Sequence, residues 1–128
     1  DQVMEVNAFA PNRLAQALLD AGLVVSDAVV ALMTSQLGAR RGRTGSLGDY
    51  GESKAALNDE FRRRADAWRE SGAVAVVIHP GWVRTDMGGS GASISVTESA
   101  DGITRVRDDL DPSQHGQFLT WQGRQHPW

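Results

Sequence analysis

The 128-residue sequence contains no cysteine, which excludes disulfide bonds and thiolate metal ligands. It contains no run of about 18 apolar residues and no basic segment followed by an apolar leader, so neither a membrane span nor a signal peptide is expected. The formal net charge of −3 argues against a nucleic-acid-binding surface, and the adjacent Arg62, Arg63 and Arg64 are interpreted as a solvated helix face. We expect a cytoplasmic protein without nucleic-acid or membrane partners.

Methionine is absent from the first position, where Asp1 opens a segment that already has a helical pattern. We therefore expect that the sequence begins within a longer protein. A chain of this length usually forms one domain. We assign residues 1–128 to a single, partial domain.

Helices and strands are predicted to alternate along the chain. Apolar residues at helical spacing indicate the helices, and short continuous apolar runs indicate strands that are buried on both faces. The helices are expected at 2–20, 49–71 and 95–110, and the strands at 28–33, 73–79 and 117–121, with a glycine-rich loop at 38–49. Strands joined by crossover helices pair in parallel, so the sequence predicts an α/β fold with a parallel sheet.

Two helix starts have the spacing of a capping box. Asp49 is followed by Glu52, and Ser95 by Glu98, so each pair can satisfy free backbone N–H groups at a helix N-terminus. Gly72 is expected to end the second helix.

Tyrosine and lysine each occur once, as Tyr50 and Lys54. Residues four apart on a helix share a face, so both polar ends can reach one site. A nearby ammonium group stabilises a phenolate, and the positive potential of the helix N-terminus acts in the same direction. Such a pair suits proton exchange with an alcohol or carbonyl oxygen, although this spacing alone is more often chance.

Two further segments are predicted to lie beside this pair. Ser35, within MTSQLG, follows the first strand, and HPGWVRTDM ends the second strand. The carboxyl ends of parallel strands meet at one edge of the sheet, where ligands bind in open α/β folds. Three separate segments are therefore expected to converge on one crevice.

Together, MTSQLG, YGESK and HPGWVRT resemble the second half of the short-chain dehydrogenase/reductase family, over essentially the whole chain. The PGWVRTDMGG segment and the tail are more loosely similar to the C-factor and sniffer-like carbonyl reductases within it. The resemblance implies the second half of a Rossmann-type doubly wound fold that lacks the N-terminal glycine-rich βαβ unit.

The resemblance also implies catalytic roles for four residues. Tyr50 is expected to be the general acid/base, and Lys54 to lower its pKa and hold the nicotinamide ribose. Ser35 is expected to hydrogen-bond the substrate oxygen. The main-chain carbonyl of Asn7 is expected to bind a water in the proton relay. Pro11 has no N–H to give to that carbonyl, which favours the water, but Pro11 can equally kink the helix or start it.

The cofactor side of the site follows from the same resemblance. Pro80, Gly81, Val83 and Thr85 are expected to line the nicotinamide of NAD or NADP, with NADP slightly favoured, and no metal is expected. A strand-ending turn alone would explain Pro80 and Gly81, but not the other two. Trp82 is placed where it can touch the substrate, but a tryptophan is more often buried packing, and we interpret it so.

The remaining features of this region are assigned as follows. His79 is interpreted as structural, and the segment from Met87 to Ser95 is expected to be a mobile substrate loop. The resemblance implies a carbonyl or alcohol compound as the substrate.

The sequence departs from the family in having no G-x-x-x-G-x-G turn for the pyrophosphate. The nicotinamide contacts alone are expected to bind no better than about millimolar, and the first strand is expected to expose an apolar edge. One interpretation is an NAD(P)-dependent oxidoreductase of which this chain is the catalytic half. The alternative is a truncated, inert or dimerising module. A plain α/β domain with coincidental motifs is a third.

Self-association is expected as a homodimer or homotetramer through the helices that carry Asn7 and Tyr50. The side chains predicted to mediate it are Leu14, Leu18, Phe61 and Trp68.

Overall fold

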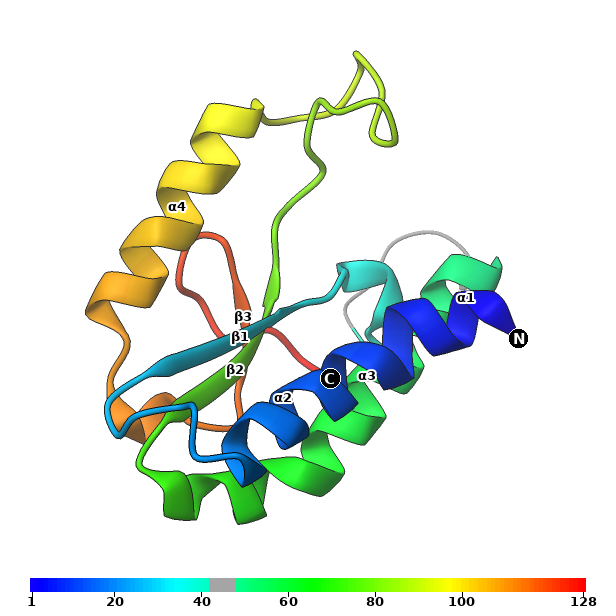
Figure 1. The fold of residues 1–128 in the computed structure, drawn as a ribbon. Helices are drawn as coiled ribbons and strands as arrows, with labels where there is room; N and C mark the ends of the chain where they lie inside the picture. Colours follow the sequence, from blue (N-terminus) through cyan, green and yellow to red (C-terminus); the bar gives the residue numbers. More distant parts are fainter. Residues whose placement is uncertain (42–47) are drawn as a thin grey trace.

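The computed structural model describes residues 1–41 and 48–128, so the centre of the predicted loop, residues 42–47, lies outside the described residues. Within them, three parallel strands form one sheet in the order β1-β2-β3 (Figure 1). The strands are β1 (Val29–Met33), β2 (Val74–His79) and β3 (Phe118–Thr120). The predicted α/β fold with parallel strands is confirmed.

Helices occupy the segments predicted for them. The first is continuous but irregular: α1 (Gln2–Met4) passes through a π-helical turn at Glu5–Phe9 into α2 (Ala10–Asp20). The others are α3 (Gly48–Trp68) and α4 (Val96–Asp109), with short 3-10 turns at Gln36–Gly38, Arg69–Ser71 and Pro112–Gln114. No helix in the described part of the chain is long and apolar enough to cross a bilayer.

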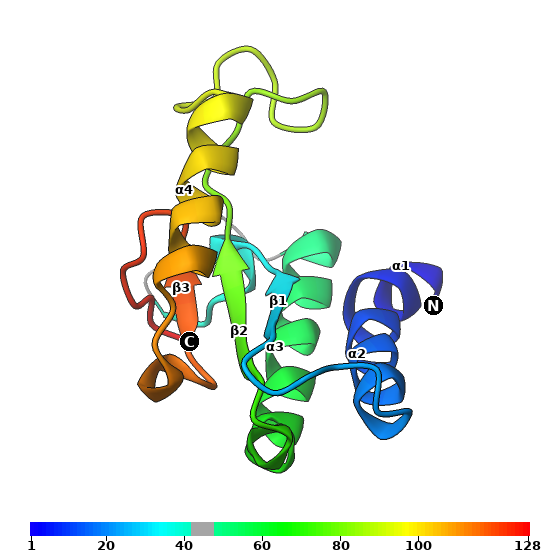
Figure 2. The same cartoon turned by 60° about the vertical axis from the view of Figure 1, so that its left-hand side comes forward.

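The sheet lies between two helical layers (Figure 2). On one face, α3 packs Phe61 and Trp68 against alternate residues of β2 and against Phe118. The helix α2 lies beside α3, and its Ala15 belongs to the same cluster. On the other face, α4 packs Val106 against Val76 and its neighbours. Because both faces of β2 are covered, this strand is buried over nearly its whole length.

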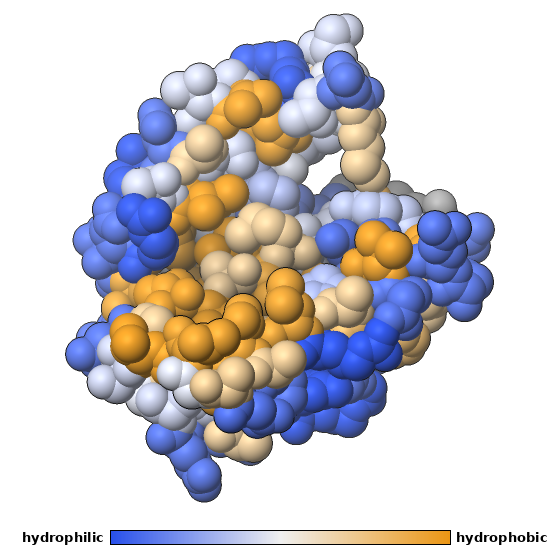
Figure 3. All heavy atoms as spheres, in the orientation of Figure 1, coloured by the Kyte–Doolittle hydropathy of each residue, from blue (hydrophilic) through white to orange (hydrophobic). Residues whose placement is uncertain are grey.

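The prediction that the first strand is buried on both faces is wrong. β1 pairs only with β2, in the register that matches Val29 with Val74 and Met33 with Ile78. It is therefore an edge strand, and Met33 is 40% exposed. Figure 3 shows an apolar area over β1 and the segment that joins α2 to it, which agrees with the apolar edge expected from the sequence.

One of the two predicted helix caps is confirmed. The Ser95 hydroxyl accepts the Glu98 N–H, and the Glu98 carboxylate accepts the Ser95 N–H, so α4 begins with a complete capping box. Gly72 ends the second helical segment with φ +83°, as expected. Asp49, in contrast, is not an N-cap: α3 begins at Gly48, which places Asp49 in its first turn.

The predicted contact surface requires a correction as well. Phe61 and Trp68 are 0% and 3% exposed, and they form part of the chain's own core, with their rings in edge contact at 5.9 Å between centroids. They face the sheet because the apolar stripe of α3 packs against it. Two buried rings of this kind do not reach a partner chain. Leu14 and Leu18 remain exposed on α2.

Candidate active site

A cavity of about 700 Å³ lies where β1 and β2 end. Six of the eight residues predicted to form the site line it, and they come from the three segments expected to converge: Ser35, Tyr50, Pro80, Gly81, Val83 and Thr85. Asn7 and Lys54 do not line the cavity. Both residues instead contact backbone or side-chain groups next to the cavity.

Tyr50 lies in the first turns of α3 and is partly buried. Burial raises the pKa of its phenol above the ordinary value, because the charged phenolate loses hydration. The sequence led us to expect the opposite direction, through the charge of Lys54. In this structure the phenol is therefore a proton donor at neutral pH.

Lys54 lies one turn after Tyr50 and spans the gap between α3 and the sheet. Its ammonium nitrogen donates a hydrogen bond to the Met33 carbonyl oxygen at 3.0 Å and lies 5.8 Å from the centroid of the Tyr50 ring. Burial lowers the pKa of Lys54, since the charged ammonium group is disfavoured away from water. The positive charge is thus held against the edge of the sheet, beside the tyrosine.

The turn that carries Ser35 is fixed by short hydrogen bonds. The Ser35 hydroxyl oxygen accepts the N–H of Leu37 at 3.1 Å, which caps the 3-10 turn. The Thr34 N–H donates to the Ile78 carbonyl at 2.9 Å, and the Thr34 hydroxyl lies 2.7 Å from the side-chain oxygen of Asn58. The hydroxyl proton of Ser35 remains available to an oxygen in the cavity.

Asn7 reaches the site through one intermediate. Its side-chain amide donates to the Ser53 hydroxyl at 3.0 Å, and that hydroxyl donates to the Tyr50 carbonyl at 2.7 Å. Pro11 stands at the start of α2, and the π-helical turn immediately precedes it, so its missing N–H coincides with an interrupted α-helical pattern. The helix carrying Asn7 is therefore tied to the turn carrying Tyr50.

The segment after β2 also lines the cavity. Gly81 has φ +89°, and a Cβ atom there would lie 2.5 Å from Ile94 and 3.0 Å from Trp121, so only glycine fits. Val83 forms a parallel bridge with Ile94. The Thr85 hydroxyl accepts the N–H of Gly88 at 3.1 Å and so closes the turn that follows.

Trp82 was interpreted from the sequence as buried packing, and this interpretation is wrong. Its side chain is 58% exposed and lines the cavity, while its indole N–H donates to the Gly88 carbonyl at 2.9 Å. The Ile94 N–H also donates to the Trp82 carbonyl at 3.2 Å. The indole is thus held at the cavity mouth by the loop that follows it.

Sequence reasoning missed the contribution of α4 to the site. Val96, Ala100 and Ile103 line the cavity at helical spacing, and Ser99 ties the helix to the strand end by donating to the Pro80 carbonyl at 2.7 Å. From the sequence, the apolar residues of this segment served only to predict the helix. Position along the helix distinguishes the two uses: Val96 and Ala100 lie in its first turns and line the cavity, Val106 packs in the core, and Ile103 between them does both.

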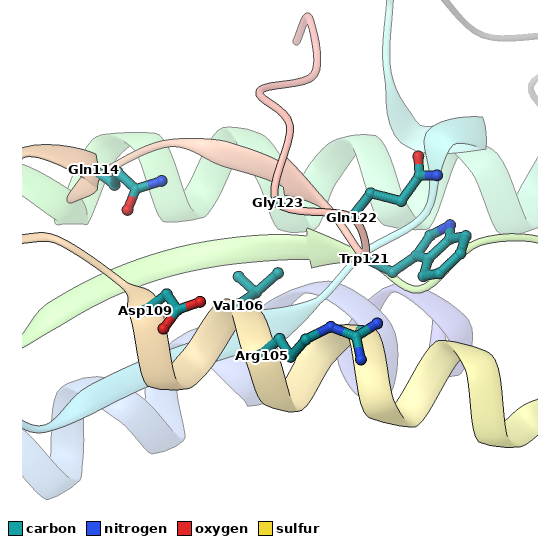
Figure 4. Close-up of a pocket in the computed structure, with 8 residues that line it drawn as sticks. Arg105, Val106, Asp109, Gln114, Trp121, Gln122 and Gly123 are labelled. Carbon is teal, nitrogen blue, oxygen red and sulfur yellow. The ribbon is translucent and has the colours of Figure 1, made fainter.

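A second cavity, of about 480 Å³, lies between α4 and the turn after β3 (Figure 4). Arg105 and Asp109 of α4 line it together with Trp121 and Gln122 of the turn. None of the predicted site residues lies there. Among residues 1–41 and 48–128, no group of three or more acidic or histidine side chains is placed to hold a metal ion.

Known proteins resemble this chain in sequence and fold. A family model described as Enoyl-(Acyl carrier protein) reductase matches residues 1–120. C-signal of Myxococcus xanthus is 40% identical over 124 residues, which are 96% of this chain and 75% of C-signal.

Two solved structures share the fold closely. The carbonyl reductase Sniffer of D. melanogaster matches with a TM-score of 0.85 and 31% identity, over 98% of this chain and 55% of Sniffer. A carbonyl reductase from Pseudomonas aeruginosa PAO1, solved in complex with NADP, matches with a TM-score of 0.82 and 39% identity, over 98% of this chain and 54% of that protein. The chain thus spans about half the length of these reductases.

Proposed function

Because the chain belongs to the short-chain dehydrogenase/reductase family, we propose that residues 1–128 form the catalytic half of an NADP(H)-dependent carbonyl reductase. The observation that carries the proposal is the cavity itself, which Ser35 and Tyr50, with their hydroxyl groups, line together with Pro80, Gly81, Val83 and Thr85. The complex of the related Pseudomonas aeruginosa reductase with NADP favours NADP over NAD. The substrate class is a carbonyl compound, or the corresponding alcohol in the reverse direction.

The residues present fit the nicotinamide end of such a cofactor. A nicotinamide is a flat apolar ring with one polar carboxamide, and the cavity offers apolar walls from Pro80, Val83 and α4 with a few hydroxyl and backbone groups. Because Gly81 has no side chain, the backbone at the strand end takes up little of the cavity. Lys54 and Tyr50 are the residues proposed to hold the ribose, and Thr85 the carboxamide and phosphate side. When bound, the reduced nicotinamide supplies a hydride to the carbonyl carbon.

The chain's own groups handle the proton. The Ser35 hydroxyl donates a hydrogen bond to the carbonyl oxygen, which stabilises the negative charge that develops there. The Tyr50 phenol gives its proton to the same oxygen, so the carbonyl becomes a hydroxyl and the tyrosine a phenolate. The Lys54 ammonium stabilises that phenolate. Asn7, through Ser53, holds the first turn of α3 in place.

A nucleotide titration tests the proposal. The purified 128-residue chain is titrated with NADPH and NADH while its tryptophan fluorescence is followed, since Trp82 lines the cavity. We expect saturable binding that is weakened in the Tyr50→Phe, Lys54→Met double variant. Arg63→Gln, an exposed change on the far part of α3, serves as the control.

Turnover is measured in parallel with a small aromatic aldehyde. Tyr50→Phe is expected to lower kcat by about 100-fold or more, the usual loss for a general acid. Folded protein that binds no nucleotide even at millimolar concentration, and reduces no aldehyde, would contradict catalysis by residues 1–128 alone and favour the alternative of a truncated, inert or dimerising module.

The proposal includes a homodimer or homotetramer formed through the first helical segment and α3. Val3, Val6, Leu14 and Leu18 are apolar side chains that remain exposed on the first segment. Apolar side chains gathered on one helical segment are typical of a protein contact. The cytoplasmic location stays a prediction.

A further inference from the structure

His79 ends β2 at the floor of the candidate site, and its ring makes a specific contact with the neighbouring strand end. Its Nδ1 accepts the backbone N–H of Gln36 at 3.1 Å, and the ring lines the main cavity. An N–H donor requires an unprotonated acceptor, so the imidazole is neutral and carries its proton on Nε2.

We propose that His79 is a positioning residue of the active site, whose Nδ1 holds the Gln36 amide and thereby fixes the turn on which Ser35 presents its hydroxyl. The structural part of this inference is independent of the reaction. Its catalytic consequence rests on the proposed function, because it requires that Ser35 contacts the substrate oxygen.

Ser35 has no direct tether to β2, but both of its neighbours do. The Thr34 N–H donates to the Ile78 carbonyl, and the Gln36 N–H donates to His79. Consecutive residues of β2 therefore hold the backbone on either side of Ser35. The first of these bonds continues the sheet ladder, whereas the second depends on a side chain and is the one that a substitution can remove.

The neutral state of His79 is maintained by its surroundings. Burial, and to a lesser extent the charge of His126, lower the pKa of His79 to about 4. The two rings lie 6.3 Å apart between centroids in an edge arrangement, and His126 itself stacks on Phe118 at 4.5 Å. The tail of the chain thus closes over the imidazole and keeps it available as an acceptor at neutral pH.

His115, which follows the 3-10 turn before β3, provides a matched control because it makes a similar bond to β2. Its Nδ1 accepts the Ala75 N–H at 3.0 Å, and its Nε2 lies 2.6 Å from the Ala65 carbonyl oxygen. The same kind of bond is thus made near the opposite end of β2, by a buried imidazole that does not line the site cavity. Loss of this bond costs stability without reaching Ser35.

The first measurement uses the unmodified, nitrogen-labelled chain. A scalar coupling across the hydrogen bond, between the Gln36 amide nitrogen and Nδ1 of His79, is expected in its NMR spectrum. Absence of the coupling, in a spectrum that shows the equivalent coupling between Ala75 and His115, would overturn the inference without any variant having to fold.

Two substitutions then separate positioning from packing. His79→Asn keeps an acceptor oxygen near the position of Nδ1, whereas His79→Leu keeps bulk and removes the acceptor. Amide exchange at Gln36 is expected to be about tenfold faster in His79→Leu, as for loss of one hydrogen bond, and close to the original rate in His79→Asn. Equal exchange rates in the unmodified chain and His79→Leu would overturn the inference.

Kinetics test the catalytic consequence. In His79→Leu, kcat for aldehyde reduction is expected to fall by about 10- to 100-fold with the NADPH KM nearly unchanged, since the substrate oxygen loses its donor. His79→Asn is expected to restore most of kcat, and His115→Leu to leave it unchanged in folded protein. If the unmodified chain reduces no aldehyde, the proposed function fails, while the coupling and exchange data still decide the role of His79.

Discussion

The ammonium nitrogen of Lys54 lies 3.0 Å from the carbonyl oxygen of Met33, to which it donates a hydrogen bond. One side chain thereby joins α3 to the end of β1, an edge strand with a single neighbour. The same charge lies near the Tyr50 ring, so Lys54 has both a structural and an electrostatic task.

Replacing Lys54 by Met is expected to raise the pKa of Tyr50 further, because the phenolate loses its neighbouring cation while the burial that already raises this pKa remains. Tyr50 is the only tyrosine, so tyrosinate absorbance reports on it alone. Lys54→Arg keeps the charge and is the control. An unchanged titration midpoint in Lys54→Met would show that Lys54 carries no charge that acts on the phenol in the pH range where Tyr50 titrates.

The sequence was sufficient to predict which segments meet at the cavity, because strand ends are easy to recognise. Ser35 and Pro80 follow apolar runs, and the geometry of a parallel sheet brings such ends together whatever the side chains are. Tyr50 could be added because it stands at the start of the next helix. These three positions depend on the alternation of elements, which the apolar pattern determines.

Details that depend on tertiary packing could not be predicted. The sequence does not show that Trp68 turns inward while Trp82 turns outward, because both are single aromatic residues next to a regular element. It does not show that Lys54 bonds Met33, since that requires the distance between α3 and β1. The prediction that Asp49 caps the helix failed because a helix can begin one residue earlier than its best capping side chain.

Stability is expected to depend on pH through His79. The pKa of this residue is lowered from 6.5 to about 4 in the folded chain. Between these values the unfolded chain binds a proton that the folded chain does not, so the free energy of unfolding decreases as pH falls from 6.5 towards 4. Above pH 6.5 the contribution of His79 to the free energy of unfolding is constant.

Urea midpoints measured across this pH range check the prediction. His79→Asn retains an acceptor for Gln36 but has no titrating group, so its curve is expected to be flatter than that of the unmodified chain. The two proteins differ at position 79 alone, so the difference between their curves reports on this side chain and its neighbours. Parallel curves would show that the burial of His79 does not disfavour its charged form.

Gly102 offers a test in which packing opposes helix propensity. It lies within α4, where alanine normally stabilises a helix by about 1 kcal/mol relative to glycine. A Cβ atom at this position would lie 2.5 Å from the Trp121 carbonyl oxygen and 2.6 Å from its ring. Gly102→Ala is therefore expected to destabilise the fold by about 1–3 kcal/mol, as overpacking does.

Thermal or urea unfolding measures this change. Gly91→Ala is the control, because a Cβ atom there meets nothing within 4 Å and its backbone φ is not positive. It is expected to change stability by less than about 0.5 kcal/mol. A stabilised Gly102→Ala variant would mean that α4 moves away from the turn at Trp121 at little cost.

Leu14 tests the proposed oligomer. It is 62% exposed on α2, in the helical segment that also exposes Val3, Val6 and Leu18. If a second copy covers this face, a glutamate at position 14 buries an unpaired charge in the contact. Leu14→Glu is expected to raise the dissociation constant of the oligomer at least about tenfold, since burial of one leucine contributes about 1.5–3 kcal/mol.

Sedimentation velocity over a range of concentrations measures this constant. Leu23→Glu is the matched control, because Leu23 is more exposed than Leu14 but follows the helix instead of lying on it. A chain that is monomeric at every concentration, or a Leu14→Glu variant that associates as strongly as the control, would exclude this face. The two variants are expected to differ in dissociation constant because of position alone, since both positions present a leucine side chain to water in the single chain.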